Sequence, residues 1–301
     1  MDFTFNVYKI LLKSFINAGY SFYSYCELLG GSKNINYKNS KNIIIRHDVE
    51  DKYDHALVMA KIEASFNLKG SYYFRIYPDD KNSMIISSIA SLGHEIGYHY
   101  DDLSACKGDV NAALIRFLKN LNYLRQFGSV ETITMEGAPL SRYDNKNLWS
   151  FPLTWELSEI ITKYYNGFDN SSPSDPAFSE NLKDGLLHYR LFGIKGEPYF
   201  DLDNEIFFYI TDTGRRWDGF KFSVRDKMPG YQKWINQGHV YHSTYDIVKA
   251  VEENRFPKQL MITVHPQRWN NKLFPWLTEW IGQNIKNMFK FGLNKFSSNN
   301  K

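Results

Sequence analysis

The chain has 301 residues, enough to bury a large core as one barrel-sized domain or as two smaller domains. Its net charge is only +3 and its charges are interspersed, so composition gives no electrostatic case for nucleic-acid binding. Two cysteines, Cys26 and Cys106, are too few for a disulfide framework or a thiolate metal site. Because the N-terminal segment lacks an export-signal pattern and no apolar run approaches membrane-spanning length, we expect a cytoplasmic protein.

The first half of the chain alternates between helical and strand patterns. Helical periodicity predicts a helix at 5–18, and the polar residues up to 40 predict a loop, so residues 1–40 are assigned to an N-terminal extension. Asp54 is the expected cap of the first helix after this extension. The remaining predictions are strands at 43–45, 71–77, 95–99 and 132–136, and helices that start near Asp54 or cover 82–92 and 114–124.

Regular alternation of strands and helices indicates parallel βαβ units, and hence a barrel or a doubly wound sheet. The second half is less regular, with loops expected at 143–147 and 166–176, strands at 206–211, 239–243 and 259–265, and a helix at 244–254. The last stretch, 276–301, predicts an amphipathic C-terminal helix. Nothing in the sequence requires a domain boundary, so a single domain covering 1–301 is predicted.

The segment 41–51 changes abruptly from apolar to charged residues. Three consecutive isoleucines predict a strand buried on both faces, and polar residues then follow at its carboxyl end, where α/β proteins build their sites. Asp48 and Glu50 are two positions apart, so on an extended chain they lie on the same side. Their mutual repulsion is relieved by a divalent metal ion or, alternatively, by an ion-pair cluster that includes Arg46.

A second polar cluster spans 93–102. On a strand, Glu95, Gly97 and His99 share one face, and His99 lies at the end of that strand. Taken with Asp48 and Glu50, this histidine predicts a metal site built from one imidazole and carboxylates, with open coordination positions.

The two clusters together resemble the polysaccharide deacetylase (NodB-homology, carbohydrate esterase 4) superfamily. The resemblance rests on Ile-Arg-His-Asp-Val-Glu at 45–50 and Gly-His-Glu-Ile-Gly-Tyr-His at 93–99, and less specifically on 136–139 and 263–269. The whole chain is similar to divergent deacetylase-like proteins found with surface-polysaccharide genes. The resemblance implies an α/β fold of the distorted (β/α)7 TIM-like barrel type.

The resemblance also implies a role for each matching residue. Asp48 matches the catalytic base, His265 the general acid, and Glu50 and His99 two ligands of a divalent metal, with zinc the expected ion. The family's second metal histidine falls at position 103, which is leucine here and cannot bind a metal. Asp102 is the first choice for the missing ligand, and the alternatives are Asp101, Glu136 and His265. A degenerate site with weak metal binding is the other interpretation.

Several residues are candidates for substrate binding. Arginines can grip a phosphate or carboxylate by bidentate pairing, although pairing with nearby aspartates is equally open and is favoured for Arg215. Neighbouring tryptophans can provide a platform for a sugar ring, or can pack in the core. The candidates are Arg46, Glu136, Arg216, Trp217, Arg268 and Trp269.

We therefore expect a metal-dependent hydrolase that removes an N-acyl group, in the first instance acetyl, from an amino sugar in glycan biosynthesis. Nucleotide-linked or lipid-linked precursors are the expected substrates, and no nucleic acid is expected as a partner. Alternatives are a catalytically degenerate homologue that binds glycans or assists assembly, and an enzyme that hydrolyses another C–N bond, such as a formamide or cyclic amide. The apolar positions of the C-terminal helix, with interleaved lysines, predict either core packing or peripheral contact with the inner face of an anionic membrane.

Overall fold

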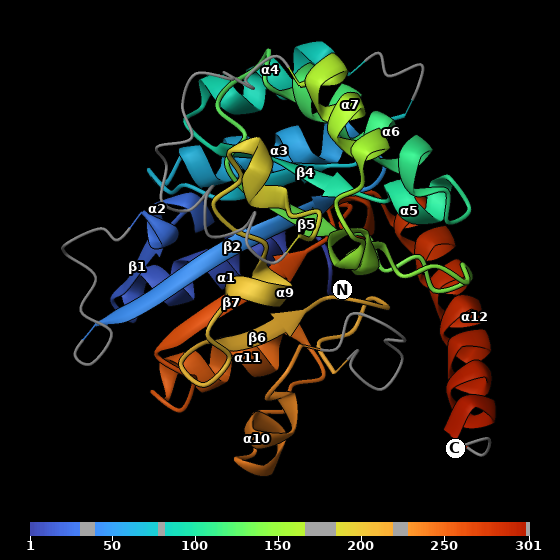
Figure 1. Cartoon of the computed structure of the whole chain (residues 1–301). Helices are drawn as coiled ribbons and strands as arrows, with labels where there is room; N and C mark the ends of the chain where they lie inside the picture. The colour runs from blue at the N-terminus through green and yellow to red at the C-terminus, as the bar shows by residue number, and fades with distance from the viewer. Residues whose placement is uncertain (31–39, 78–81, 166–184, 219–227, 299–301) are drawn as a thin grey trace. The chain divides into compact units, whose positions relative to one another are not determined.

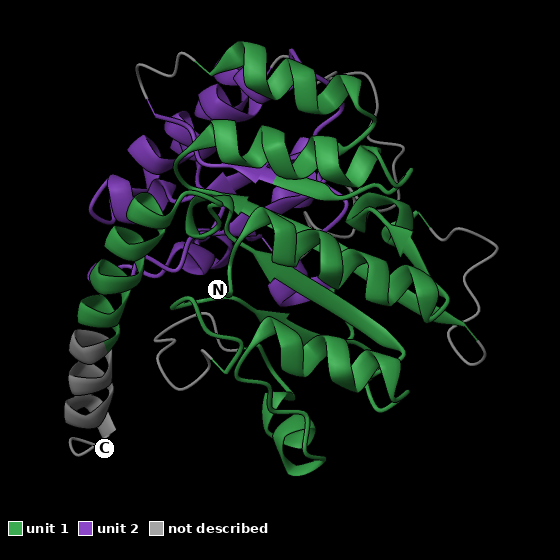
Figure 2. Ribbon diagram, turned by 180° about the vertical axis from the view of Figure 1, so that it is seen from behind, with its two compact units in different colours: residues 1–72, 81–95, 202–301 green, residues 73–80, 96–201 purple. Residues whose placement is uncertain are grey.

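A computed structural model describes residues 1–30, 40–77, 82–165, 185–218 and 228–298, with side chains described as far as Asn287 in the last of these ranges. The chain divides into two compact units. The single domain predicted over 1–301 stays a prediction. Unit 1 comprises Met1–Tyr72, Lys81–Glu95 and Leu202–Lys301, and unit 2 comprises Tyr73–Asp80 and Ile96–Asp201 (Figure 2).

Unit 1 is built on a parallel sheet (Figure 1). Strand β2 (Lys41–Val49) pairs with β1 (Tyr20–Tyr23) and with β7 (Gln259–Val264), and β7 pairs in turn with β6 (Phe208–Thr211). The run Ile43–Ile45 is fully buried in β2, as its continuous β-branched composition predicts. Parallel pairing brings the carboxyl ends of β2, β7 and β6 to one edge of the sheet.

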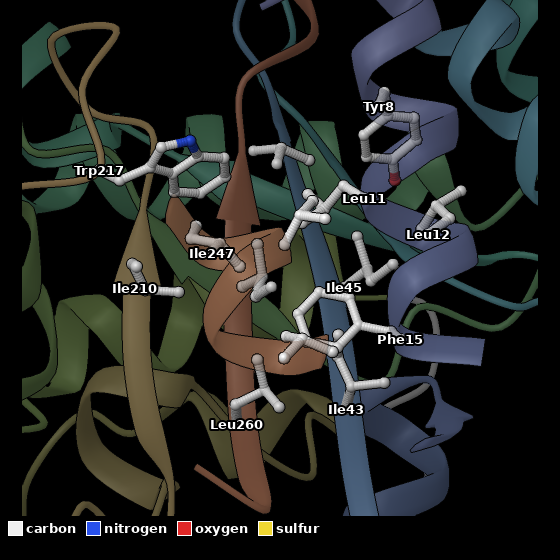
Figure 3. Close-up of a cluster of buried hydrophobic side chains, with 14 of the residues drawn as sticks. Tyr8, Leu11, Leu12, Phe15, Ile43, Ile45, Ile210, Trp217, Ile247 and Leu260 are labelled. Carbon is white, nitrogen blue, oxygen red and sulfur yellow. The ribbon is translucent and has the colours of Figure 1, made fainter. Parts of the chain in front are cut away.

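Helices cover this sheet and complete the core of unit 1. Helix α1 (Phe5–Asn17) is capped by the Thr4 hydroxyl and turns Tyr8, Leu11, Leu12 and Phe15 inward. These side chains pack with residues of β2, β6, β7 and α11 (Thr244–Glu252) in one hydrophobic cluster (Figure 3). The first helix therefore contributes to the hydrophobic core of unit 1. The other helices of this unit are α2 (Tyr25–Leu29), α3 (Tyr53–Ala64), α4 (Ser83–Ser91), α10 (Tyr231–Asn236), η4 (Pro266–Arg268) and α12 (Leu273–Ser298).

Unit 2 contains the parallel pair β4 (Glu95–Tyr100, of which Glu95 belongs to unit 1) and β5 (Ile133–Met135). Its longest helix, α6 (Val110–Leu124), buries the predicted apolar face, which consists of Leu114, Phe117, Leu118, Leu121 and Leu124. Shorter elements complete the unit: α5 (Asp102–Ala105), η1 (Asn145–Ser150), α7 (Trp155–Tyr164), η2 (Tyr189–Phe192) and α9 (Pro198–Asp201). One strand, β3 (Ser71–Phe74), begins in unit 1 and ends in unit 2.

The predicted class, an α/β protein with parallel strands, is confirmed. Among the described strands, the sheet of each unit is open, so neither unit by itself is a closed barrel. The strand predicted at 239–243 is wrong, because these residues form irregular backbone that leads into Ser243, the N-cap of α11. Asp54 lies within the first turn of α3, and the N-cap is Lys52 in the left-handed conformation. The loop expected at 166–176 lies outside the described residues.

None of the helices in the described ranges combines the length and the apolar character that crossing a membrane requires.

Candidate functional site

Three polar residues of unit 1 lie at one edge of its sheet. Two of them were predicted as site residues from the sequence, and the third, Asp212, was not. Asp48 is on β2, His265 directly follows β7, and Asp212 directly follows β6. The strand register pairs His47 with Val264 and Thr211 with Thr263, so the residues that come next along each strand are neighbours. The sheet topology thus assembles an imidazole and two carboxylates from three separate segments, the first of which, with Asp48, lies more than 150 positions before the other two.

Asp212 orients the His265 ring. Its Oδ1 lies 2.6 Å from His265 Nδ1, and its Oδ2 accepts from the His265 backbone N–H at 3.1 Å. Arg268 and Trp269 donate to the same carboxylate, each at 2.8 Å. Burial alone would raise the pKa of Asp212, but the charges of His265 and Arg268 and the hydrogen bonds lower that pKa to about 2. The ionised carboxylate accepts only, so Nδ1 of His265 carries the proton and Nε2 faces away from Asp212.

The other ring nitrogen of His265 faces two carboxylates. Nε2 lies 3.4 Å from Glu50 Oε1 and 3.9 Å from Asp48 Oδ2. The imidazole is buried, and Glu50 is the partly exposed member of the group. A histidine held by one carboxylate and facing others is an arrangement suited to proton transfer, because its orientation and tautomer are both set before a substrate arrives.

Arg46 is the ion-pair partner of Asp48. Its Nε and one terminal nitrogen contact the two carboxylate oxygens at 2.7 and 2.8 Å, and both side chains are buried. Such a bidentate pair fixes the plane of the carboxylate as well as its position. Arg46, which the sequence placed among the substrate-binding residues, therefore positions Asp48. The ion-pair interpretation of this segment holds for Arg46 and Asp48, while Glu50 is outside that pair.

A fully buried polar cluster lies on the other side of β2. His47 Nε2 is 2.6 Å from Glu63 Oε1, and the hydroxyls of Tyr8 and Tyr72 donate to the same glutamate. His94 lies 3.5 Å from Glu63 Oε2 and accepts from the Gly70 N–H at 3.0 Å. Burial opposes ionisation of Glu63, but His47, His94 and the Tyr8 hydroxyl lower its pKa below the usual value. His47 is thus a completely buried residue that contacts Glu63.

Unit 2 contains the predicted metal histidine, His99, on β4. Its Nδ1 lies 2.9 Å from Thr134 Oγ1, and its Nε2 lies 3.2 Å from Glu136 Oε2. The strand register pairs His99 with Thr134, which places Glu136, just beyond the end of β5, beside the imidazole. Burial opposes ionisation of Glu136, but the hydrogen bond and charge of His99, with Arg75, lower its pKa well below the usual value.

The geometry of His99 and Glu136 fits two ligands of one ion. Two ligand atoms of a tetrahedral zinc ion, each about 2.1 Å from the metal, are about 3.4 Å apart, and the observed separation is 3.2 Å. Thr134 fixes the ring orientation through its contact with Nδ1, the nitrogen that faces away from Glu136, which is the usual arrangement around metal-binding histidines.

Asp102, the first choice for the missing metal ligand, is engaged elsewhere. Both of its carboxylate oxygens accept from the Tyr98 hydroxyl at 2.9 Å, and Arg116 donates to one of them at 2.7 Å. Burial raises the pKa of Asp102 to about 7. The residue starts helix α5 and is wholly inaccessible. Asp102 is therefore replaced by Glu136 as the carboxylate beside His99.

The other substrate-binding candidates are also occupied. Trp217 and Trp269 are almost completely buried, pack against Phe3, and so offer no face to a sugar (Figure 3 shows Trp217). Arg268 belongs to the Asp212 cluster. Arg216 forms a bidentate pair with Asp218 at 2.8 and 3.1 Å. Arg215 donates to the Trp276 carbonyl oxygen and lies over that indole ring, in place of the expected aspartate pairing.

The sequence interpretation missed Asp212 and Glu63. Asp212 directly follows a predicted strand, as His265 does, so the signal was present, but it required knowing that β6 and β7 are neighbours. Glu63 lies within helix α3, and a glutamate in a helix ordinarily faces solvent, so nothing in the local sequence distinguished it.

The fold and these clusters define an α/β protein with carboxylate–imidazole pairs at the carboxyl ends of parallel strands. Comparison with protein-family models, with curated proteins and with solved structures found no match for this chain.

Proposed function

We propose that the protein is a metal-dependent hydrolase that removes an N-acyl group, in the first instance acetyl, from an amino sugar. The observation that carries this proposal is the Asp212–His265 pair, whose free ring nitrogen faces Asp48 and Glu50. Amide hydrolysis requires a base for the attacking water and an acid for the departing amine, and a fixed imidazole beside a fixed carboxylate supplies both. The resemblance of 45–50 and 93–99 to polysaccharide deacetylases favours the same reaction and a barrel arrangement of the strands.

Each residue of this cluster has a distinct role in the proposal. Asp48 accepts the proton of the attacking water, and Arg46 holds its carboxylate in place. His265, with both ring nitrogens protonated, donates the proton on Nε2 to the departing amine nitrogen, and Asp212 holds the ring through Nδ1–H. Asp212 is thus a positioning residue.

The proposed metal ligands in unit 2 are His99 and Glu136, which lie side by side. Glu50 is the further ligand that the resemblance to polysaccharide deacetylases implies. A mixed nitrogen and oxygen donor set suits zinc, although cobalt, nickel or iron accept the same types. A metal bound there would polarise the amide carbonyl and acidify water. Leu103, at the position of the family's second histidine, is buried and apolar. We propose that Glu136 supplies the ligand that the second histidine supplies in the family.

The substrate is proposed to be a nucleotide-linked or lipid-linked amino sugar, and the lipid-linked form is favoured by α12. Six large apolar side chains of this helix are exposed at a spacing that forms one stripe: Leu273, Phe274, Leu277, Trp280, Ile281 and Ile285. Lys272 and Lys286 flank the stripe and are also exposed. An apolar stripe with flanking lysines suits peripheral binding to an anionic membrane.

Metal analysis and an activity screen test this proposal. The purified chain, loaded with zinc and desalted, should retain about one equivalent of metal and release acetate from N-acetylated amino sugars. His99→Ala and Glu136→Gln should each lower metal retention at least about tenfold, whereas Glu156→Gln, at an exposed position of α7, should not. Equal metal retention in all variants would contradict the ligand assignment. Formate release in place of acetate release would show that the acyl group is formyl, and ring opening would show that the substrate is a cyclic amide.

A further inference from the structure

A second candidate binding site in unit 2 is a cavity of about 510 Å³, apart from the His99–Glu136 pair. Its walls come from η1, from η2 together with the preceding His188, and from α9. This volume is in the usual range for small-molecule sites. The residues that line it include aromatic side chains, two acids and two bases.

The aromatic walls form a corner. Phe200 is half exposed, and the ring of Tyr199 stands at 84° to it with 5.4 Å between centroids. Tyr189 stacks on Phe200 from the interior, at 6.2 Å and 26°. Two perpendicular rings do not make a parallel slot for a flat nucleobase. They suit a puckered ring, which presents an apolar C–H face and a polar edge at the same time.

The charges of the cavity cancel. Arg190 pairs with Asp201 at 2.7 Å, and Asp201 also accepts from the Tyr189 hydroxyl at 2.6 Å. Lys146 lies 3.6 Å from Asp144, and its ammonium group lies 3.5 Å from the centroid of the Tyr199 ring. An anion would have to break these pairs, and an organic cation would compete with Lys146 for the ring. A neutral ligand with adjacent donors and acceptors, such as a polyol, matches this lining.

The cavity is tied to the end of β5. Glu197, which precedes α9, accepts from the Met135 backbone N–H at 3.2 Å, and Asn145 of η1 donates to the Glu136 carbonyl oxygen at 2.7 Å. The walls formed by η1 and α9 are therefore each hydrogen-bonded to the backbone at the end of β5, at Glu136 and Met135 respectively. This anchoring holds the cavity and the His99–Glu136 pair in a constant relation.

We infer that this cavity is a binding site for a neutral saccharide ring, with Phe200 and Tyr199 as its platform and Asp201, Arg190 and Lys146 as partners for hydroxyl groups. Saccharide binding here is separate from the proposed hydrolysis and requires neither metal nor turnover. Failure of one proposal therefore leaves the other standing.

Ligand-observed nuclear magnetic resonance on the full chain tests the inference. The probes are glucose, N-acetylglucosamine, uridine and inorganic phosphate. At least one of the two sugars should bind with millimolar affinity, and uridine and phosphate should not displace it. Phe200→Ala and Tyr199→Ala should each weaken sugar binding about tenfold, because each removes one ring of the platform.

Trp155→Ala is the matched control, since Trp155 is an aromatic residue of the same unit that is 77% exposed and does not line the cavity. Its sugar affinity should equal that of the unmodified chain. Circular dichroism verifies that each variant is folded, and Phe200→Leu replaces Phe200→Ala if the latter is not. The inference is overturned if neither sugar binds at about 10 mM, if phosphate or uridine displaces the sugar, or if both platform variants bind as tightly as the control.

Discussion

Asp212 and His265 are in contact through Oδ1 and Nδ1, 2.6 Å apart, although 53 positions separate them in the chain. The contact exists because β6 and β7 are parallel neighbours that end at the same edge. It directs the second nitrogen of the imidazole towards Asp48 and Glu50. The reactivity that we propose depends on this orientation.

Replacing Asp212 by Asn should therefore reduce kcat much more than it changes KM. The neutral amide removes the negative charge that stabilises the ring when both of its nitrogens are protonated, and this is the form from which Nε2 donates its proton. We expect kcat to fall about 10²–10⁴-fold in steady-state assays of acyl release. The matched control is Asp54→Asn, at an exposed position in the first turn of α3. An unchanged kcat in folded Asp212→Asn protein would show that the pair has no part in the reaction.

Glu63 should be a major contributor to the stability of unit 1. Its carboxylate accepts hydrogen bonds from Tyr8 and Tyr72 and contacts His47, all without access to water. In Glu63→Gln, the new N–H₂ group faces donors, so buried groups lose partners. We expect the free energy of unfolding to fall by about 2–4 kcal/mol in urea titrations. Glu252→Gln, at an exposed position of α11, should change it by less than about 0.5 kcal/mol, and equal effects would refute the assignment.

His94 should make stability depend on pH. Burial lowers the pKa of His94 below that of an unfolded histidine. Below about pH 6.5 the unfolded chain binds a proton at this residue that the folded chain does not, so stability is full above this pH and declines as the pH falls towards the folded pKa. His94→Asn should have a smaller loss of stability between pH 7.5 and 5.5 than the unmodified chain. Identical pH slopes would contradict the prediction.

Helix α12 should bind anionic vesicles through its exposed stripe. Trp280→Glu and Ile281→Glu place charge in the stripe and should abolish cosedimentation with vesicles that contain phosphatidylserine. Met84→Glu, at an exposed apolar residue of α4, should leave it unchanged. High salt should weaken the binding, because part of the attraction comes from lysines. If the unmodified chain does not bind these vesicles, the proposed membrane contact of α12 is wrong and no longer favours a lipid-linked substrate.

Local patterns in the sequence predicted some elements well. Three consecutive isoleucines identified β2, and the leucine spacing identified α6, because burial on both faces or on one helical face leaves a direct periodic signal. The segment 239–243 lacked such a constraint, and its hydrogen bonds are those of a turn and a helix cap. Short elements such as β1 and α2 were missed because they contain too few residues to establish a period.

Residues of the candidate site were predictable only where a polar, potentially reactive side chain lies at the end of a recognisable strand. Asp48, His99 and His265 could be selected from sequence because each ends a recognisable strand. That Glu136, and not Asp102, lies beside His99 could not be predicted, since it depends on which strand pairs with β4 and on the position of Arg116. Tryptophans beside arginines, such as Trp217 and Trp269, are equally consistent with a sugar platform and with core packing. Only their burial in the folded structure distinguishes the two interpretations.

Acyl release by the Asp48→Asn variant is the most direct test of the proposed chemistry. The zinc-loaded chain should release acetate and free amine in equal amounts from an N-acetylated amino sugar, and Asp48→Asn should lower that rate at least about a hundredfold while it retains the metal. Contradiction would come from zinc-loaded protein that releases no acyl group from these substrates, or from an Asp48→Asn variant as active as the unmodified chain.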